Sequence, residues 1–231
     1  MINLSDLLTS CNGAVAGNTY ATAFDDFAYD SRNVLPNQLF VAVTTETDDG
    51  HRYIHEACRE GATGVLCQQA PEPLPEGITV IVVPDTRQAL KDYARFVFRA
   101  PGRTVIGIAG TMGKTSTKEA IASVLSQCGD DDSVFRSHGN QNGRYGLAIA
   151  SGEIECRHRT LVLELAFDAV GEAAELADMA APSVLVLTNL DAAYLESFGD
   201  IENIARELAR LITMLPADGT LIYNADDERL V

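Results

Sequence analysis

One segment constrains the fold of this chain more than any other: an apolar strand that leads through a glycine-rich loop into a helix. The loop reads GIAGTMGKT over residues 107–115. The run 104–109 is apolar and rich in β-branched residues, and residues 114 to about 127 have the pattern of a helix. A strand, a glycine loop and a helix in this order form a phosphate-binding unit of a parallel α/β sheet.

The chemistry of this loop favours ATP binding. The pattern GxxxxGK[ST] fails by one residue because the glycine stands at position 107 and not at 108. Two later glycines let the backbone N–H groups turn toward phosphates, and the helix N-terminus adds partial positive charge. Lys114 places an ammonium on the β/γ oxygens, and the Thr115 hydroxyl can take a Mg²⁺ position. The predicted nucleotide-binding residues are Gly110, Thr111, Gly113, Lys114, Thr115 and Ser116. The alternative, a glycine-rich turn beside a solvated lysine, is disfavoured because a GKT at a strand-to-helix junction is rarely without function.

Strands and helices alternate along the rest of the chain. The predicted strands are 39–43, 64–67, 79–83, 104–109, 160–165, 183–188 and 220–224, and the predicted helices are 53–60, 86–98, 114–127, 169–180 and 201–214. Residues 98–103 form the best domain boundary, since a helical pattern stops there and a strand begins. We therefore predict two α/β domains, residues 1–100 and 101–231, the second a P-loop-type parallel sheet that ends incomplete.

Composition excludes several classes of protein. The chain has 17 basic and 33 acidic residues and a formal net charge of −16, so a general nucleic-acid or anionic-membrane binder is not expected. No apolar run is long enough for a membrane span, and residues 1–6 lack the basic start of a signal peptide. The five cysteines are odd in number and without CxxC spacing, which disfavours a disulfide framework or a zinc site. A reduced, cytoplasmic protein is expected.

Carboxylates in three places, and one pair of histidines, could be metal ligands or solvated groups. Glu164 ends an apolar strand of the expected parallel sheet, where ligands bind, and an unpaired carboxylate there is expensive, so we predict a metal role. The acids Glu172 and Glu175 lie on an alanine-rich helix and are predicted to face solvent. The run 130–132 is predicted to be a solvated loop. His51 and His55, although four residues apart, have no acidic third ligand at helical spacing and are predicted to bind no metal.

The loop and five further segments resemble the Mur ligases of peptidoglycan precursor synthesis. Residues 110–119, with a Thr-Lys-Glu after the loop, resemble most the branch that adds D-alanyl-D-alanine to UDP-N-acetylmuramoyl-tripeptide. The other matching segments, in order, are 30–32 with 39–42 and 49–51, then 139–142, 163–165, 188–190 and 224–227. The resemblance covers essentially the whole chain.

The resemblance implies an ATP-dependent reaction. ATP phosphorylates a substrate carboxylate, and an amine attacks the acyl phosphate to form an amide, so positioned cations and backbone donors do most of the work. The N-terminal domain is implied to hold the uridine nucleotide of the substrate. The family's functions map onto Lys114 for the transferred phosphate, Thr115 and Glu164 for Mg²⁺, Asn140 beside ATP, and Ser31 and Arg32 near the uridine diphosphate.

The chain also departs from the family. Tyr194 stands where the family has a histidine that helps to bind a second Mg²⁺, and Leu208 where it has a carbamylated lysine. Arg144 replaces an acid of the asparagine-rich segment, and the glycine expected before residues 49–51 is missing. Family members carry a third domain, whereas this sequence ends inside the expected central domain. We expect ligase activity of this chain alone to be impaired or absent.

Two functions therefore stay open. One is an ATP-dependent ligase of the D-alanyl-D-alanine-adding type, with ATP and a UDP-N-acetylmuramoyl-peptide as ligands. The other is a non-catalytic paralogue that binds nucleotide or UDP-sugar as a regulatory or partner subunit. A generic P-loop NTPase is disfavoured, because residues 30–32 and 39–42 have no role in one. An incomplete sheet would expose an edge, so we also expect self-association or a partner chain that completes the domain.

Overall fold

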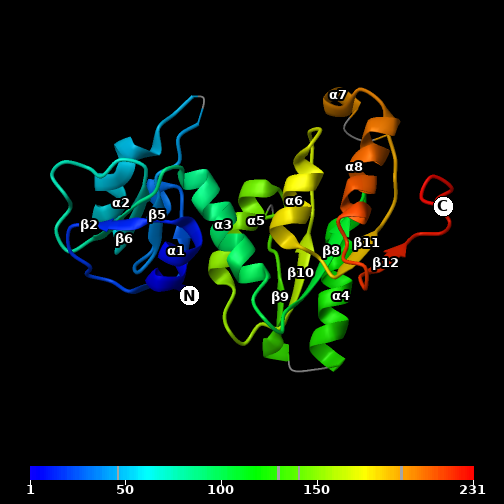
Figure 1. Cartoon of the computed structure of the whole chain (residues 1–231), viewed down its shortest axis with the longest axis horizontal. Coiled ribbons are helices and arrows are strands. Elements are labelled where there is room, and N and C mark those ends of the chain that lie inside the picture. The colour runs from blue at the N-terminus through cyan, green and yellow to red at the C-terminus, as the bar shows by residue number, and fades with distance from the viewer. Residues whose placement is uncertain (46, 129–130, 140, 193–194) are drawn as a thin grey trace. The chain divides into compact units, whose positions relative to one another are not determined.

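The computed structural model describes residues 1–231 apart from 46, 129–130, 140 and 193–194 (Figure 1). The chain divides into two compact units. Unit 1 comprises residues 1–93 and 151–153, and unit 2 comprises residues 94–150 and 154–231.

Unit 1 is built on a mixed five-stranded sheet in the order β2-β7-β6-β5-β4. These strands are β2 (Ala14–Ala16), β4 (Phe27–Ala28), β5 (Leu39–Val41), β6 (Gly64–Cys67) and β7 (Thr79–Val82). Only β2 runs antiparallel to its neighbour, and a separate antiparallel pair joins β1 (Ile2–Asn3) to β3 (Ala23–Phe24). The helices are α1 (Leu4–Cys11), α2 (Ile54–Glu60) and the first part of α3 (Thr86–Phe98), with 3-10 turns at Ser31–Asn33 and Gly50–Tyr53.

Sequence explains why the centre of this sheet is closed to solvent. Every residue of β5 and β6 is buried, as in the interior strands of a sheet covered on both faces. The first residue of β6, Gly64, has no room for a side chain, because a Cβ there would lie 2.3 Å from the ring of Phe24. The sheet packs against α2 through Ile54 and Ala57, which join Phe40 and Val65 in one apolar cluster.

Unit 2 contains the predicted parallel sheet. Its five strands lie in the order β12-β11-β8-β10-β9, and every pair is parallel. They are β8 (Thr104–Ala109), β9 (Val134–Arg136), β10 (Thr160–Glu164), β11 (Val184–Leu187) and β12 (Thr220–Tyr223). The helices are α4 (Lys114–Cys128), α5 (Arg144–Ala150), α6 (Glu172–Ala180), α7 (Leu195–Phe198) and α8 (Ile201–Thr213), with a 3-10 turn at Asp131–Ser133. A further 3-10 turn, at Ser151–Glu153, belongs to unit 1. The prediction of an α/β chain with a parallel second sheet is confirmed.

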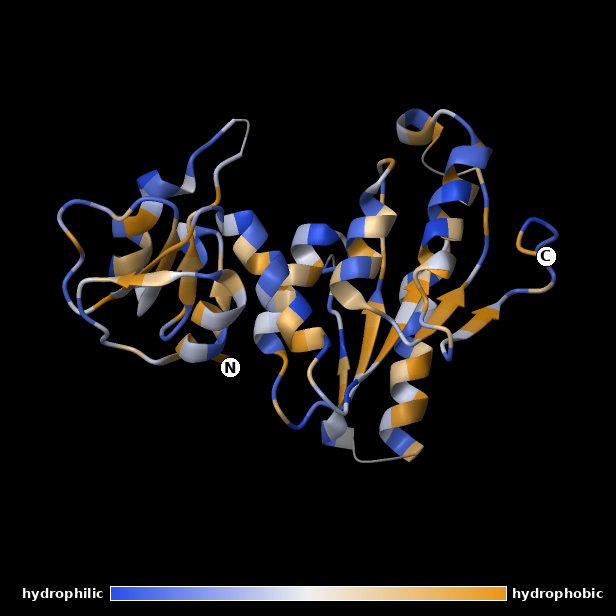
Figure 2. Ribbon diagram, in the orientation of Figure 1, coloured by the Kyte–Doolittle hydropathy of each residue, from blue (hydrophilic) through white to orange (hydrophobic). Residues whose placement is uncertain are grey.

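Hydropathy shows how unit 2 is held together. In Figure 2 the central strands of this sheet are apolar, whereas the helices carry one apolar and one polar side. Helix α4 covers β8 and β10 where Ala122 packs on Ile108 and Val162. The edge strand β12 is different, since Ile222 is 52% exposed and Tyr223 44% exposed.

No helix within the described residues is long and apolar enough to cross a membrane.

Candidate functional site

The glycine loop lies between β8 and α4, and two of its glycines are required by its conformation. Gly110 has a φ of +131°, and a Cβ there would lie 2.2 Å from Oγ1 of Thr188. Gly113 has a φ of +78° with open space around it, so only the backbone conformation demands glycine at that position. The loop passes close to the segment after β11 and leaves its other side open.

Lys114, the first residue of α4, folds back over this loop. Its Nζ donates hydrogen bonds to the carbonyl oxygens of Gly110 at 2.9 Å and Thr111 at 3.2 Å. Burial lowers the pKa of the Lys114 ammonium, and the nearby Glu164 carboxylate acts in the opposite direction. The cation is thus held at the mouth of the loop by carbonyl groups, which a phosphate oxygen can replace as acceptors.

Glu164 and Thr115 meet directly beside Lys114. Glu164 is the last residue of β10 and is only 2% exposed. Its Oε2 accepts a hydrogen bond from Oγ1 of Thr115 at 2.8 Å, and its Oε1 accepts one from Nδ2 of Asn142 at 3.0 Å. The backbone N–H of Glu164 donates to Oγ of Ser137 at 3.1 Å. A buried carboxylate and a hydroxyl therefore share one point at the carboxyl end of the sheet.

This pair of oxygen donors fits a magnesium ion. Mg²⁺ binds proteins through one or two oxygen ligands and takes the rest of its coordination from water and substrate phosphates. Thr115 and Glu164 supply that kind of donor set next to the phosphate loop. No group of three or more histidine, cysteine, aspartate or glutamate residues that could hold a metal by themselves occurs in the described part of the chain.

Asn189, which follows β11, fixes the shape of the loop. Its Oδ1 accepts hydrogen bonds from Oγ1 of Thr111 at 2.7 Å and from the backbone N–H of Met112 at 2.8 Å. Its own carbonyl accepts the N–H of Thr111 at 3.1 Å, while Oγ1 of Thr188 donates to the carbonyl of Met112 at 2.6 Å. The loop is therefore formed in advance of any ligand.

Sequence reasoning missed Ser137, and it placed Asn142 and Asn189 in segments that match the family without giving either residue a role. Each is polar and follows a strand or lies in the loop after one, at the carboxyl end of the parallel sheet. That position is where ligands bind in open α/β sheets, so the signal was present.

The structure places the other predicted residues as follows. Thr111 is buried in the loop, and Ser116 is exposed on the first turn of α4. Asn140 and Tyr194 lie outside the described residues. Leu208 is buried on α8 and is only 2% exposed.

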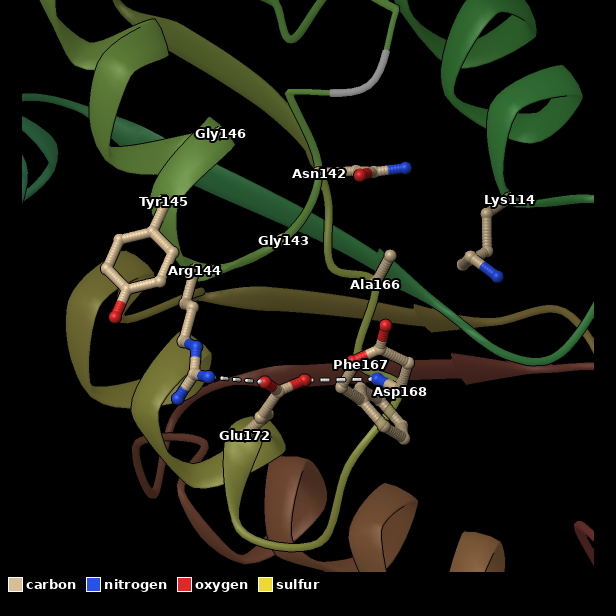
Figure 3. A pocket seen from close by; sticks show the side chains of 10 residues that line it. All are labelled: Lys114, Asn142, Gly143, Arg144, Tyr145, Gly146, Ala166, Phe167, Asp168 and Glu172. Carbon is tan, nitrogen blue, oxygen red and sulfur yellow. Dashed lines mark hydrogen bonds and ion pairs between the residues drawn. The ribbon is translucent and has the colours of Figure 1, made fainter. Parts of the chain in front are cut away.

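A cavity of about 460 Å³ opens beside Lys114 (Figure 3). Its charged lining consists of Lys114, Arg144, Asp168 and Glu172. The prediction that Glu172 faces solvent is wrong, because its side chain is only 13% exposed. Its Oε1 pairs with Nη2 of Arg144 at 3.2 Å, and its Oε2 accepts the backbone N–H of Asp168 at 3.1 Å. This carboxylate holds the start of α6 to α5.

Unit 1 has a second cavity, of about 530 Å³, whose wall includes Ser31 and Arg32. Oγ of Ser31 donates to Oε2 of Glu56 at 2.6 Å. The Arg32 guanidinium binds the Asp30 carboxylate through Nε and Nη2, each at 2.8 Å, and this holds the pKa of Asp30 below its usual range. Both predicted substrate-binding groups line one cavity, and each is already paired with an acid.

Comparison with known protein families places the chain in one class. Residues 108–231 match the protein family described as "Mur ligase middle domain", and residues 27–97 match the one described as "Mur ligase family, catalytic domain". The chain therefore belongs to the Mur ligase family, which confirms the resemblance drawn from its motifs.

Individual relatives point to one branch of that family. The chain is 33% identical over 219 residues to the UDP-N-acetylmuramoyl-tripeptide--D-alanyl-D-alanine ligase of Bacillus subtilis, an alignment that covers 94% of this chain and 47% of the relative. MurF ligase from Thermotoga maritima, solved in complex with ADP, is 32% identical with a TM-score of 0.75, covering 89% of this chain and 47% of that one. MurF from Acinetobacter baumannii shares the fold, with a TM-score of 0.86 at 24% identity over 98% of this chain and 49% of that one. The chain spans about half the length of the curated relatives it matches.

Proposed function

We propose that this chain provides the nucleotide-binding and UDP-sugar-binding part of an ATP-dependent ligase that joins a carboxylate to an amine. The reaction is of the type that adds D-alanyl-D-alanine to UDP-N-acetylmuramoyl-tripeptide, as the names of its relatives state for them. The observation that carries the proposal is the meeting of Lys114, Thr115 and Glu164 around a preformed glycine loop. Within this proposal the domain of residues 1–100 binds the UDP-sugar, and that of residues 101–231 binds ATP.

The phosphoryl-transfer step uses groups already aimed at the loop. The N–H groups of the loop and the start of α4 bind the phosphates of ATP. Lys114 exchanges the carbonyl oxygens of Gly110 and Thr111 for an oxygen of the transferred phosphate. Thr115 and Glu164 would hold Mg²⁺, which supplies neutralisation of the phosphate charge when bound. Asn142 keeps Glu164 in the required orientation through its hydrogen bond to Oε1.

The acyl-transfer step fits the cavity beside Lys114. A substrate carboxylate that enters this cavity comes within reach of the transferred phosphate, because Lys114 lines the cavity and also caps the loop. The carboxylate takes the phosphoryl group of ATP as ADP leaves, and an amine then attacks the acyl phosphate, loses a proton and displaces inorganic phosphate to form the amide. In unit 1, Ser31 and Arg32 would exchange Glu56 and Asp30 for the uridine diphosphate. We place this reaction in the cytoplasm, where ATP is available.

Calorimetric titration with Mg²⁺-ATP tests the nucleotide site. We expect the whole chain to bind Mg²⁺-ATP saturably. Lys114→Ala should weaken the affinity about 10–100-fold, because the substitution removes a buried, charged hydrogen-bond donor. Lys91→Ala is the matched control, since Lys91 is on α3 and does not line the loop cavity. An unmodified chain that binds no nucleotide, or a Lys114→Ala variant that binds as tightly as Lys91→Ala, overturns the proposal.

Specific features favour a second candidate function, a non-catalytic paralogue that binds nucleotide and UDP-sugar as a regulatory or partner subunit. Leu208 is buried on α8 and carries no nitrogen that could be carbamylated, and Arg144 replaces an acid of the family. Release of ADP from ATP, dependent on UDP-N-acetylmuramoyl-tripeptide and D-alanyl-D-alanine, distinguishes the two. ADP release supports the ligase, and nucleotide binding without it supports the paralogue.

A further inference from the structure

The short segment after β12, residues 224–229, reaches back to the segment that follows β11. Figure 1 shows it in red, beyond β12. It begins at Asn224, whose backbone N–H donates to the carbonyl oxygen of Leu187, the last residue of β11. Because β11 and β12 are parallel neighbours, both segments leave the sheet at the same edge, where the glycine loop also lies. No group that we assign to the phosphates or to Mg²⁺ belongs to residues 224–229.

Two side chains of this segment hold both backbone groups of Leu190. Oδ2 of Asp227 accepts the backbone N–H of Leu190 at 2.7 Å, and Nη1 of Arg229 donates to its carbonyl oxygen, also at 2.7 Å. Asp227 is itself fixed, because its Oδ1 accepts the backbone N–H of Arg229 at 3.1 Å. Leu190 is only 3% exposed, so its backbone groups need protein partners in place of water. Both partners are charged, which makes these hydrogen bonds stronger than neutral ones.

The residues on either side of Leu190 both bind the glycine loop. Before it, Oδ1 of Asn189 accepts the hydroxyl of Thr111 and the backbone N–H of Met112. After it, the backbone N–H of Asp191 donates to Oγ1 of Thr111 at 2.8 Å. The hydroxyl of Thr111 is therefore bound from both sides of Leu190. A shift of Leu190 displaces both groups that hold this part of the loop.

We propose that Asp227 and Arg229 are positioning residues for nucleotide binding. They clamp Leu190, and residues 189 and 191 transmit this constraint to the glycine loop. Neither side chain needs to touch the nucleotide, because both act through the segment between. The inference rests on the proposed function, in which the glycine loop binds ATP. Coupling between two sites is reciprocal, so a nucleotide in the loop must in turn stabilise the clamp on Leu190.

Calorimetric titration of the whole chain with Mg²⁺-ADP measures what the clamp contributes to affinity. Asp227→Ala is expected to weaken ADP binding about 3–10-fold, the effect of about one hydrogen bond. Asp227→Asn keeps an acceptor oxygen and should restore most of the affinity. Asp226→Ala is the matched control, because it removes an exposed carboxylate one residue earlier in the same segment. If Asp227→Ala binds ADP as tightly as Asp226→Ala does, the proposal is wrong.

A double substitution tests whether the clamp acts through Asn189. In Asn189→Ala the acceptor that holds the loop is already gone, so adding Asp227→Ala should weaken ADP binding less than Asp227→Ala does alone. Fully additive losses in affinity contradict transmission through this residue. Arg229→Ala removes the donor to the carbonyl of Leu190 and should also weaken ADP binding. An unchanged affinity in this variant excludes Arg229 from the clamp.

Amide hydrogen exchange separates a clamp on the loop from a general loss of stability. Without nucleotide, Asp227→Ala should speed exchange of the Met112 amide about 3–10-fold and leave that of Leu163, in the central strand β10, unchanged. Equal acceleration at both amides, or none at Met112, overturns the clamp. Saturating Mg²⁺-ADP should slow exchange of the Leu190 amide in the unmodified chain, and an unchanged rate contradicts the coupling. If the unmodified chain binds no ADP, the proposed function fails, whereas the exchange rates measured without nucleotide still test the clamp.

Discussion

Asn189 is expected to control nucleotide affinity although it need not touch the nucleotide. Its side-chain oxygen accepts two hydrogen bonds from the loop, one from Oγ1 of Thr111 and one from the N–H of Met112. Asn189→Ala removes this acceptor and with it both hydrogen bonds, so the loop must be ordered when the nucleotide binds. At about 0.5–1.5 kcal/mol for each hydrogen bond, the loss is about 1–3 kcal/mol, or about 5–150-fold in Kd.

Calorimetric titration with Mg²⁺-ADP measures this loss. Asn189→Asp keeps the acceptor oxygen but places a negative charge beside the phosphates, so we expect it to bind no better than Asn189→Ala. Asn203→Ala is the matched control, because Oδ1 of Asn203 also accepts a hydrogen bond, from the Arg206 guanidinium, but does so on α8. An Asn189→Ala variant whose Kd equals that of Asn203→Ala refutes the idea that this residue preforms the loop.

Further predictions concern the stability of the fold and the conformation of the glycine loop. Glu207 is buried and accepts hydrogen bonds from the backbone N–H groups of Gly171 and Ala173. Glu207→Leu should therefore lower the free energy of unfolding, measured in urea, by about 2–5 kcal/mol. Glu207→Gln keeps an acceptor and should lower it by less than half as much. Burial raises the pKa of Asp26 from 3.8 to about 6, so the ionisation of Asp26 lowers the stability of the folded chain as pH rises between these values. Asp26→Asn should therefore raise the unfolding free energy by about 1–2 kcal/mol at pH 7 and leave it unchanged at pH 3. An equal gain at both pH values contradicts this assignment. Gly110→Ala should abolish ADP binding, because the added Cβ would collide with Thr188. Gly113→Ala has open space around its Cβ and should cost only about 1–2 kcal/mol of backbone strain. Equal effects of the two variants on ADP affinity would be inconsistent with the structure.

Local patterns predicted the regular part of the fold well. Strands β6 and β8 and helix α3 have the predicted bounds, because each is a long or strongly apolar run with turn residues at its ends. Helix α1 was missed, although Leu4, Leu7 and Cys11 have helical spacing, because it is short and its N-cap makes no side-chain hydrogen bond. Helix α5 was missed because the glycines at 139, 143 and 146 indicate a loop, and only tertiary packing of its apolar residues stabilises a helix there.

The site was predictable as far as sheet topology determines it. Lys114 comes after β8 and Glu164 is the last residue of β10, and these strands are parallel neighbours, so sheet topology predicts that the two residues lie close together. The pairing of Glu172 with Arg144 was not predictable, because it depends on the packing of α5 against α6 and on the rotamers of two long side chains. From sequence alone, a glutamate on an alanine-rich helix is predicted to face solvent, because the neighbouring helix that covers it is not known.

The central claim is that Thr115 and Glu164 form a magnesium site that serves a nucleotide in the glycine loop. Its most direct test is the Kd of ADP measured with and without Mg²⁺ for the unmodified chain and for Glu164→Gln, which keeps the shape of the side chain and the contact with Asn142 or Thr115. We predict that Mg²⁺ tightens ADP binding about tenfold or more in the unmodified chain and has little effect in Glu164→Gln. The same Mg²⁺ dependence in both proteins, or no ADP binding by the unmodified chain, would contradict it.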